Sequence, residues 1–404
     1  MSIEIEAWVK LAAFTGAGFS MGLGAIGAAV GEGYAAAKAN AAISEKPDSS
    51  GDIVKMMLVG QAIAETAAIF ALVIAVLLLF AAGGEMSIIT ASGLLGAGLS
   101  MGLGAVGSGV GAGLPAGEAC TGLAKQPTLN RNFTTTMLIG AAVSQTPAIF
   151  AMVVAFMLMF INFAGGSMHM VAALLSAGLC MGFGAIGSGV GSGFPAGEAC
   201  AGMARQPAMG GRLTTNMLIG AAVSQTPAIF AMVVAFMLMF MNFSSLPLHP
   251  TSAALLGAGL ATGLAAIGSG VGSGLAGGAG CEGWARNPFT TGNVLVIMLV
   301  GQAVSQTPSI FGLLISFVLM FKSYPSADIF LISTAVFSAG LCMGLGGIGS
   351  GVGNGMTAQS AVTWVARNVE QEGVLMRTML VGQAVSQSTA IYAMVIALAL
   401  IFLV

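Results

Sequence analysis

The chain alternates between two kinds of long apolar segment, and its polar residues gather in the short stretches between them. One kind is rich in glycine, such as GLLGAGLSMGLGAVGSGVGAGL from Gly93. The other is rich in Met, Val and Phe, such as MLIGAAVSQTPAIFAMVVAFMLMF from Met137. Both kinds exceed the roughly 20 residues that a helix needs to cross the hydrocarbon core of a membrane. A helix also satisfies its own backbone hydrogen bonds in lipid, so the pattern predicts an all-α membrane protein.

The pair of segments recurs along the whole chain. The string from Met137 returns unchanged at 217–240, and looser copies begin at Met57, Met298 and Met379. The residues at the centre of the five copies lie 80 or 81 positions apart: Glu65, Gln145, Gln225, Gln306 and Gln387. So regular a period indicates five tandem antiparallel helical hairpins with ten transmembrane helices. We expect the hairpins to cover residues 1–84, 85–164, 165–245, 246–325 and 326–404.

Composition supports a lipid-facing surface. Of the 404 residues, 57% are hydrophobic and only 6% are charged, whereas a soluble domain has about a quarter of its residues charged. The net charge of −2 therefore says nothing about nucleic acid. The 61 glycines lie mainly in the first segment of each hairpin, where small residues let helices approach closely. We expect two concentric layers, with the glycine-rich helices inside and the bulky helices facing lipid.

The basic residues predict how the chain is oriented in the membrane. Ten of the twelve lie near the turn within a hairpin, and only Lys10 and Lys322 lie elsewhere. Because cytoplasmic loops carry an excess of Lys and Arg, we expect the five turns in the cytoplasm and both termini outside. The acidic N-terminal stretch lacks a small-residue cleavage site, so we do not interpret it as a signal peptide.

Two other patterns do not indicate a site. The string GLGAVG from Gly102 matches a dinucleotide-binding motif, but that motif needs a preceding strand and a βαβ unit. The five cysteines form no CxxC pair and have no histidine at metal-ligand spacing, so we interpret them as small apolar helix residues. Glu118, Glu198 and Glu282 lie near the turns, where we expect hydrated helix ends.

The strongest candidate for function is Glu65, because a carboxylate near the middle of a transmembrane helix is costly. Gln61 lies one turn earlier on the same face and Thr66 follows directly. Glu32, in the partner helix, lies at a similar distance from the turn near residue 47, so it is expected at similar depth or as a hydrated residue nearer the end. Carboxylate, amide and hydroxyl oxygens suit a small cation such as Na⁺, and two carboxylates can share a proton.

The other four hairpins have lost this acid. Gln145, Gln225, Gln306 and Gln387 replace Glu65, and an amide neither titrates nor neutralises a cation. The position of Glu32 is also neutral in the other hairpins, where it holds Ala112, Ser192, Ser273 and Asn354. We therefore expect one titrating site in the second helices and four degenerate ones.

A glycine-rich helix, a short basic turn and a second helix with a central Glu resemble the c subunit, or proteolipid, of rotary ATP synthases. The first hairpin, with GAIGAAVGEGYAAAKA and MLVGQAIAETAAIF, is similar to c subunits of Na⁺-translocating F-type enzymes. The Arg-Gln-Pro turn of that family appears as Arg205-Gln206-Pro207, with variants Lys125-Gln126-Pro127, Arg286-Asn287-Pro288 and Arg367-Asn368. The resemblance covers the chain five times and implies part or all of a two-layer c-ring.

The resemblance implies specific roles. Glu65 would bind the translocated ion, with Thr66, the Ile63 carbonyl and Glu32 completing a Na⁺ site, and Gln61 beside it. The family usually has Gln where this chain has Glu32, which leaves H⁺ open as the ion. The turns would contact the central stalk, and the second helices would pass an Arg of the stator a subunit. No organic cofactor and no catalysis on ATP are implied, and the membrane would be a bacterial plasma membrane.

Several alternatives remain open at this stage. The ring would contain only copies of this chain, or it would mix them with one-hairpin c subunits. The enzyme would run as a synthase or as an ATP-driven pump, for which one acid in five hairpins means few ions for each turn. Outside the rotor class, five hairpins would also suit a non-rotary ion channel or a structural membrane scaffold.

Overall fold

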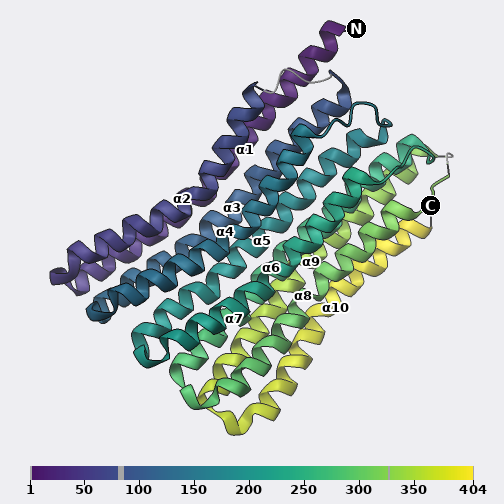
Figure 1. Cartoon of the computed structure of the whole chain (residues 1–404). Coiled ribbons are helices and arrows are strands. Elements are labelled where there is room, and N and C mark those ends of the chain that lie inside the picture. The colour runs from purple at the N-terminus through teal and green to yellow at the C-terminus, as the bar shows by residue number, and fades with distance from the viewer. Residues whose placement is uncertain (1, 81–85, 326–327, 404) are drawn as a thin grey trace.

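The computed structural model describes residues 2–80, 86–325 and 328–403, and within them every regular element is helical (Figure 1). The first helices of the five hairpins are α1 (Ser2–Glu45), α3 (Ile88–Lys125), α5 (His169–Arg205), α7 (Leu248–Arg286) and α9 (Ile329–Arg367). The second helices are α2 (Ser50–Phe80), α4 (Asn130–Phe160), α6 (Gly210–Phe240), α8 (Thr291–Phe321) and α10 (Glu372–Phe402). The prediction of an all-α protein with ten membrane-spanning helices is confirmed in the described part of the chain.

Short segments link one hairpin to the next. The expected boundaries at 164/165 and 245/246 fall between α4 and α5 and between α6 and α7. The boundaries at 84/85 and 325/326 touch residues outside the described part.

The helices are longer than the membrane is thick. The second helices have 31 residues each and α1 has 44. At 1.5 Å for each residue these lengths are about 46 Å and 66 Å, against a hydrocarbon core of about 30 Å. Both ends of each hairpin therefore extend into the headgroup region or the water beyond it.

A short 3₁₀ turn joins the two helices of each hairpin. In the first four hairpins it begins with proline, at Pro47, Pro127, Pro207 and Pro288. Proline suits the first position of a helical turn because it has no N–H to leave unpaired there. The first helix ends just before the turn, and in hairpin 2 the Gln126 N–H donates to the Gly122 carbonyl at 2.9 Å. All five turns lie at the same end of the protein (Figure 1).

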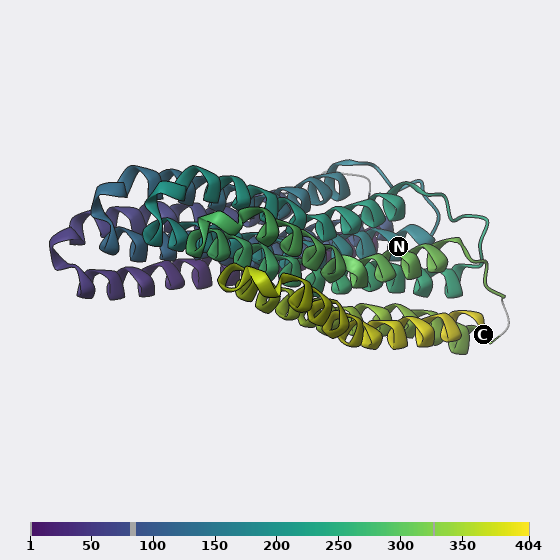
Figure 2. The same ribbon diagram turned by 90° about the horizontal axis from the view of Figure 1, so that it is seen from below.

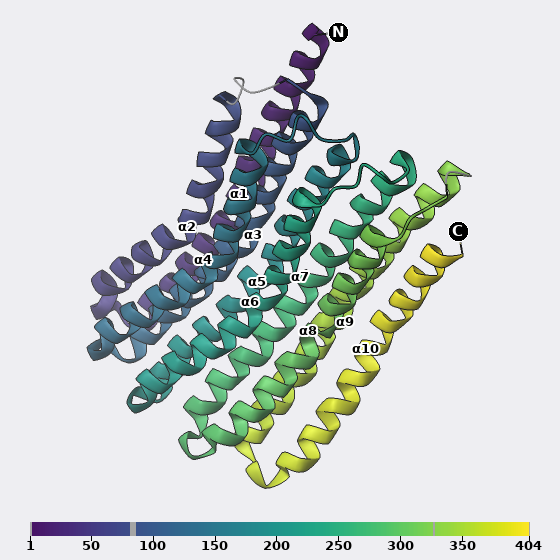
Figure 3. The same cartoon turned by 45° about the vertical axis from the view of Figure 1, so that its right-hand side comes forward.

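The hairpins stand side by side in two layers (Figures 2 and 3). The glycine-rich helices pack directly on one another in chain order, whereas successive second helices touch much less. In hairpins 2 to 4 the glycine-rich helices are almost free of exposed large side chains, and the second helices expose residues such as Leu138, Ile149 and Phe160. Large apolar side chains on that outer layer are what a lipid-facing surface requires.

One glycine in each of hairpins 2 to 5 lies against the backbone of the preceding glycine-rich helix. A Cβ added at Gly109, Gly189, Gly270 or Gly351 would lie 2.4–2.6 Å from backbone atoms of the preceding hairpin. No side chain fits at that distance, so this repeat position needs glycine in all four interfaces inside the chain. The atoms it meets belong to Gly27, Gly107, Gly187 and Gly268 or to the residue after them.

The two terminal hairpins lie at opposite edges of the array (Figure 1). Glycine positions that are filled inside the array are open at these edges, and a Cβ at Gly349 of α9 would meet nothing within 4 Å. Its counterpart Gly268 would place a Cβ 2.1 Å from the Ile348 carbonyl oxygen of the next hairpin. Each edge therefore presents one half of an interface that the chain uses four times internally.

Candidate ion-binding site

The central glutamines of hairpins 2 to 4 tie neighbouring second helices together. The Nε2 of Gln145 donates to the Ile63 carbonyl at 2.9 Å, and Gln225 and Gln306 donate to the Val143 and Val223 carbonyls at 2.8 Å. In each case the acceptor lies two residues before the central residue of the preceding hairpin. Each amide therefore bridges two hairpins at the position where Glu65 stands in hairpin 1.

Proline supplies the acceptor for two of these bonds. Pro147 and Pro227 lie inside continuous helices, four residues after Val143 and Val223. Because proline has no N–H, these two carbonyls lack the usual helix donor four residues later, and each accepts the glutamine amide of the next hairpin. The proline of one hairpin thus leaves a carbonyl available, and the central glutamine of the next hairpin donates to it.

A serine in the glycine-rich helix stabilises the same point from the other side. Ser108 Oγ accepts the N–H of Ala148, the residue that follows Pro147, at 3.1 Å. Hairpins 3 and 4 repeat the contact at the same distance between Ser188 and Ala228 and between Ser269 and Ser309. The sequence reasoning missed these serines, although each lies 40 residues before the donor it accepts from, and that offset is visible in the repeats.

Glu65 lies at the open edge of the array. Its side chain is exposed, whereas Gln145 retains 5% of its accessible surface. Glu32 is half-buried on α1, and the two carboxyl groups are close enough to interact electrostatically. By the geometry of the inner interfaces, the group opposite Glu65 would belong to another hairpin placed against the open edge of hairpin 1.

The other residues predicted around Glu65 divide between two places. Gln61 donates its amide to the backbone carbonyl of Glu32 at 3.1 Å, so it links α2 to α1. The hydroxyl of Thr66 donates to the Ile63 carbonyl at 2.6 Å, and that carbonyl also accepts Gln145. The structure therefore keeps Glu32 with Glu65 and places Ile63 and Thr66 at the contact with hairpin 2.

The counterparts of Gln61 in hairpins 4 and 5 each make a second hydrogen bond that Gln61 does not make. Gln302 donates to the Ser273 carbonyl of its own hairpin at 2.8 Å and to the Gly220 carbonyl of the preceding hairpin at 3.0 Å. Gln383 makes the same pair of bonds, to Asn354 and Gly301. Gln61 makes only the first kind. Its second acceptor would again come from a preceding hairpin.

The last hairpin departs from the pattern. Asn354 Nδ2 lies 3.4 Å from the Val304 carbonyl, the acceptor that Gln387 would use by analogy with the earlier hairpins. Thr389 replaces the proline, and the Ser388 hydroxyl donates to the Val385 carbonyl at 2.7 Å. Val385 is exposed, with 67% of its accessible surface retained, so its backbone lies on the free edge of α10.

The three glutamates near the turns differ from the expectation of simple hydrated ends, because Glu118 and Glu282 form ion pairs and Glu198 is partly buried. Lys38 Nζ lies 2.8 Å from Glu118 and joins hairpins 1 and 2, and Arg286 lies 2.7 Å from Glu282. One carboxylate oxygen of Glu198 is buried without a hydrogen-bond partner. The predicted stalk-facing basic residues Lys125, Arg205, Arg286 and Arg367 are all exposed beside the turns, next to Gln126-Pro127, Gln206-Pro207 and Asn287-Pro288.

The cysteines have the predicted character. All five lie in glycine-rich helices, none forms a disulfide, and four are buried.

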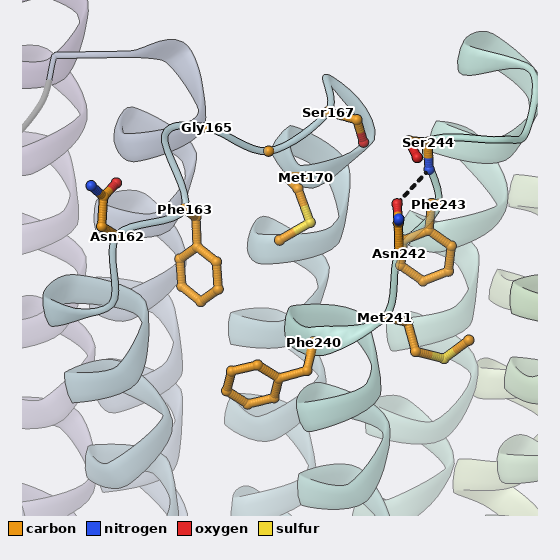
Figure 4. A pocket seen from close by; sticks show the side chains of 11 residues that line it. Asn162, Phe163, Gly165, Ser167, Met170, Phe240, Met241, Asn242, Phe243 and Ser244 are labelled. Atoms are coloured by element: carbon orange, nitrogen blue, oxygen red, sulfur yellow. Dashed lines mark hydrogen bonds between the residues drawn. The ribbon is translucent and has the colours of Figure 1, made fainter.

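A cavity of about 440 Å³ lies far from Glu65, between the α4–α5 and α6–α7 links (Figure 4). Its walls are formed by Phe163, Met170 and Phe243 together with small polar residues, and the Asn242 side chain accepts the N–H of Ser244 at 3.0 Å. The described side chains that line it carry no charge. We therefore assign it no part in ion binding.

Comparison with known proteins agrees with the five-fold repeat. Residues 15–78, 95–158, 175–238, 256–319 and 337–400 each match the family of ATP synthase C subunits. The chain is 48% identical to the ATP synthase c subunit of Natranaerobius thermophilus over 79 residues, which is 20% of this chain and 91% of that protein. It is 51% identical to the ATP synthase c subunit of Thermotoga maritima over 65 residues, 16% of this chain and 76% of that protein.

A longer match is found with the K subunit of the A-type ATP synthase of Methanocaldococcus jannaschii. It is 31% identical over 227 residues, which is 56% of this chain and 94% of that protein. The five family matches together cover most of the 404 residues and coincide with the five hairpins. The chain therefore belongs to the family of ATP synthase C subunits, as a c subunit in which five hairpins are fused into one polypeptide.

Proposed function

We propose that this chain is a rotor-ring subunit of a rotary ATP synthase or ATPase that carries Na⁺ or H⁺ through the membrane by reversible binding at Glu65. One observation carries the proposal. The central position of the second helices is a carboxylate only in hairpin 1, whereas hairpins 2 to 4 fill it with amides that bond to their neighbours. An amide bonded in this way has no proton or cation to exchange.

The other half of the Glu65 site would come from α10 of the copy before it in the ring. In hairpins 2 to 4, the central amide donates to the carbonyl two residues before the central residue of the preceding hairpin, and in the last hairpin the corresponding carbonyl belongs to Val385. Ser388, beside it, adds a hydroxyl oxygen. Together with Glu65 and Glu32 these are hard oxygen ligands, as a small cation or a shared proton requires. Gly382 would supply the second acceptor that Gln61 lacks.

The orientation and partners follow from the same proposal. The turns with exposed Arg205 and Arg286 would face the cytoplasm and the central stalk, and the termini would lie outside. An Arg of the stator would meet Glu65 as the ring turns. The chain contributes ion translocation and no chemistry on ATP.

The number of carboxylates in the ring sets how many ions cross the membrane in each turn. Moving one charge through 100 mV is worth about 2.3 kcal/mol, so a ring with one acid in five hairpins gains little torque from an ion gradient. Such a ring suits ATP-driven pumping of few ions in each turn against a steep gradient. Intact-mass measurement of the purified ring decides between a homomeric ring and one that includes one-hairpin c subunits.

Selective labelling tests the ion site. A hydrophobic carbodiimide reacts with protonated carboxyl groups in apolar surroundings and should label Glu65 once in each chain. In Glu65→Gln the label and ATP-driven ion transport should both disappear while the ring still assembles. Label that persists in this variant would refute the assignment, and failure to copurify with stalk and catalytic subunits would refute the rotor role.

Protection by Na⁺, measured in the parent protein and in a Glu32 variant, distinguishes Na⁺ from H⁺ as the translocated ion. If Na⁺ is carried, Na⁺ should slow the labelling of Glu65, and Glu32→Gln should preserve that protection because an amide oxygen still coordinates the ion. If H⁺ is carried, Na⁺ should give no protection in either protein. Protection in the parent that vanishes in Glu32→Gln would show that the second carboxylate is itself required for the cation.

A further inference from the structure

In the glycine-rich layer, the contact expected between two copies of this chain would differ from the contacts inside it at the position of Ala29. We call this contact the seam, formed by α9 and α10 of one copy and α1 and α2 of the next. Inside the chain, one close approach of glycine-rich helices recurs at Gly109, Gly189, Gly270 and Gly351. The same repeat position in hairpin 1 holds Ala29, whose side chain is exposed at the open edge of α1.

The residue that Ala29 would meet is Gly349 of the preceding copy. Gly349 is the counterpart of Gly27, Gly107, Gly187 and Gly268, which receive the close glycines of the next hairpin inside the chain. In those interfaces an added Cβ falls 2.4–2.6 Å from backbone atoms, whereas ordinary contact begins near 3.4 Å. Backbone atoms of two packed helices cannot move aside as a side-chain end can, so the helices themselves must separate.

We propose that the seam between two copies of this chain is wider than the four interfaces inside it, by about 1 Å at Ala29. Ala29 precedes Glu32 by three residues, or about one helical turn. The widening therefore lies at the depth of the Glu65 site and gives the exchanging carboxylate more room than the four amide positions have. Separation by 0.5–1 Å also forfeits a quarter to a half of the dispersion attraction, so the seam is the weakest contact in the ring.

A second copy of this chain fits the open edge because the two edges carry complementary halves of one repeated contact. Thr136 and Thr214 meet with their hydroxyls 3.3 Å apart between hairpins 2 and 3. Their counterparts across the seam are Thr378 on α10 and Val54 on α2, and both are exposed in the single chain.

Cross-linking tests the occupant of the seam. With the native cysteines replaced, Val54→Cys with Thr378→Cys should link one chain to another. The control pair Thr136→Cys with Thr214→Cys should link two hairpins within one chain, because those hydroxyls lie 3.3 Å apart. Dimers and longer ladders of the 404-residue chain support a second copy. Links to a one-hairpin protein instead would overturn the choice of partner and leave the proposed rotor function standing.

The rate at which the purified ring separates into chains in detergent tests the width. Ala29→Gly should slow separation about tenfold by restoring the inner geometry, and Gly349→Ala should speed it by a similar factor. Gly211→Ala, at an exposed position in the middle hairpin, should change neither rate. If cross-links form between copies but Ala29→Gly separates at the parental rate, the seam is as tight as the inner contacts and this inference is wrong. The inference rests on the proposed rotor ring, and the cross-links between copies would still support that ring.

Discussion

Gln145 offers a direct test of the idea that the amide positions are ion sites from which the charge has been removed. In Gln145→Glu, an oxygen replaces the nitrogen that lies 2.9 Å from the Ile63 carbonyl, so two acceptors face each other in a buried position. Leaving a buried acceptor unpaired costs about 1–3 kcal/mol, and more for a charged group. The new carboxyl avoids this cost only as the neutral acid, whose O–H donates to Ile63, or with a cation held between the oxygens.

A free-energy difference of about 1–3 kcal/mol corresponds to roughly a 5- to 150-fold preference for the neutral or cation-bound form. A hydrophobic carbodiimide, read by intact mass, should therefore label Gln145→Glu at two positions in each chain and the parent at one. The variant with both Glu65→Gln and Gln145→Glu should keep one label.

Gln145→Ala is the matched control, because it loses the hydrogen bond without adding an acid, and one label is expected. The reasoning would be refuted by a single label in Gln145→Glu under conditions where Glu65 reacts fully, provided that the variant ring assembles as the parent does.

Two further predictions concern stability. Ser108→Ala leaves the Ala148 N–H without its acceptor and should lower the free energy of unfolding by about 1–3 kcal/mol. The loss should be smaller in a Pro147→Ala background, where the helix can pair that N–H itself. Additive losses of stability in the double-mutant cycle would contradict this. Lys322→Met removes the ammonium that donates to the Ile401 carbonyl near the end of α10, which should cost about 1 kcal/mol and speed hydrogen exchange there. Unchanged exchange at that helix end would show that the contact does not hold α10.

The sequence was sufficient to predict the hairpins, but it was insufficient to predict which residues of neighbouring hairpins contact one another. Helix length, the central Glu or Gln and the basic turns all follow from a period of 80 or 81 residues and from lipid as the solvent, so the fold was predicted. Which face of a second helix meets the next hairpin depends on the direction in which the array winds. That direction is a property of helix packing and is not visible in spacing. The sequence therefore grouped Ile63 and Thr66 with Glu65, but it did not show that the Ile63 carbonyl also accepts Gln145 of the next hairpin.

The roles of proline and serine also needed three dimensions. Pro147 alone indicates a missing backbone bond, but the group that uses the free carbonyl of Val143 is Gln225, a full repeat away. Ser108 likewise acts on a helix 40 residues later. Contacts of this kind connect repeats, so they are invisible when each position is compared only with its own counterparts.

Fusion changes how such a ring assembles. The links between described hairpins are short, such as the seven residues between α6, which ends at Phe240, and α7, which begins at Leu248. A tether of this length holds neighbouring hairpins at an effective concentration in the millimolar range or above, so four of every five contacts form without a bimolecular encounter. The order of hairpins is also fixed during synthesis. A ring built from this chain alone always places four exchange-free hairpins between carboxylates, and random mixing of charged and neutral hairpins, which separate polypeptides would permit, does not occur.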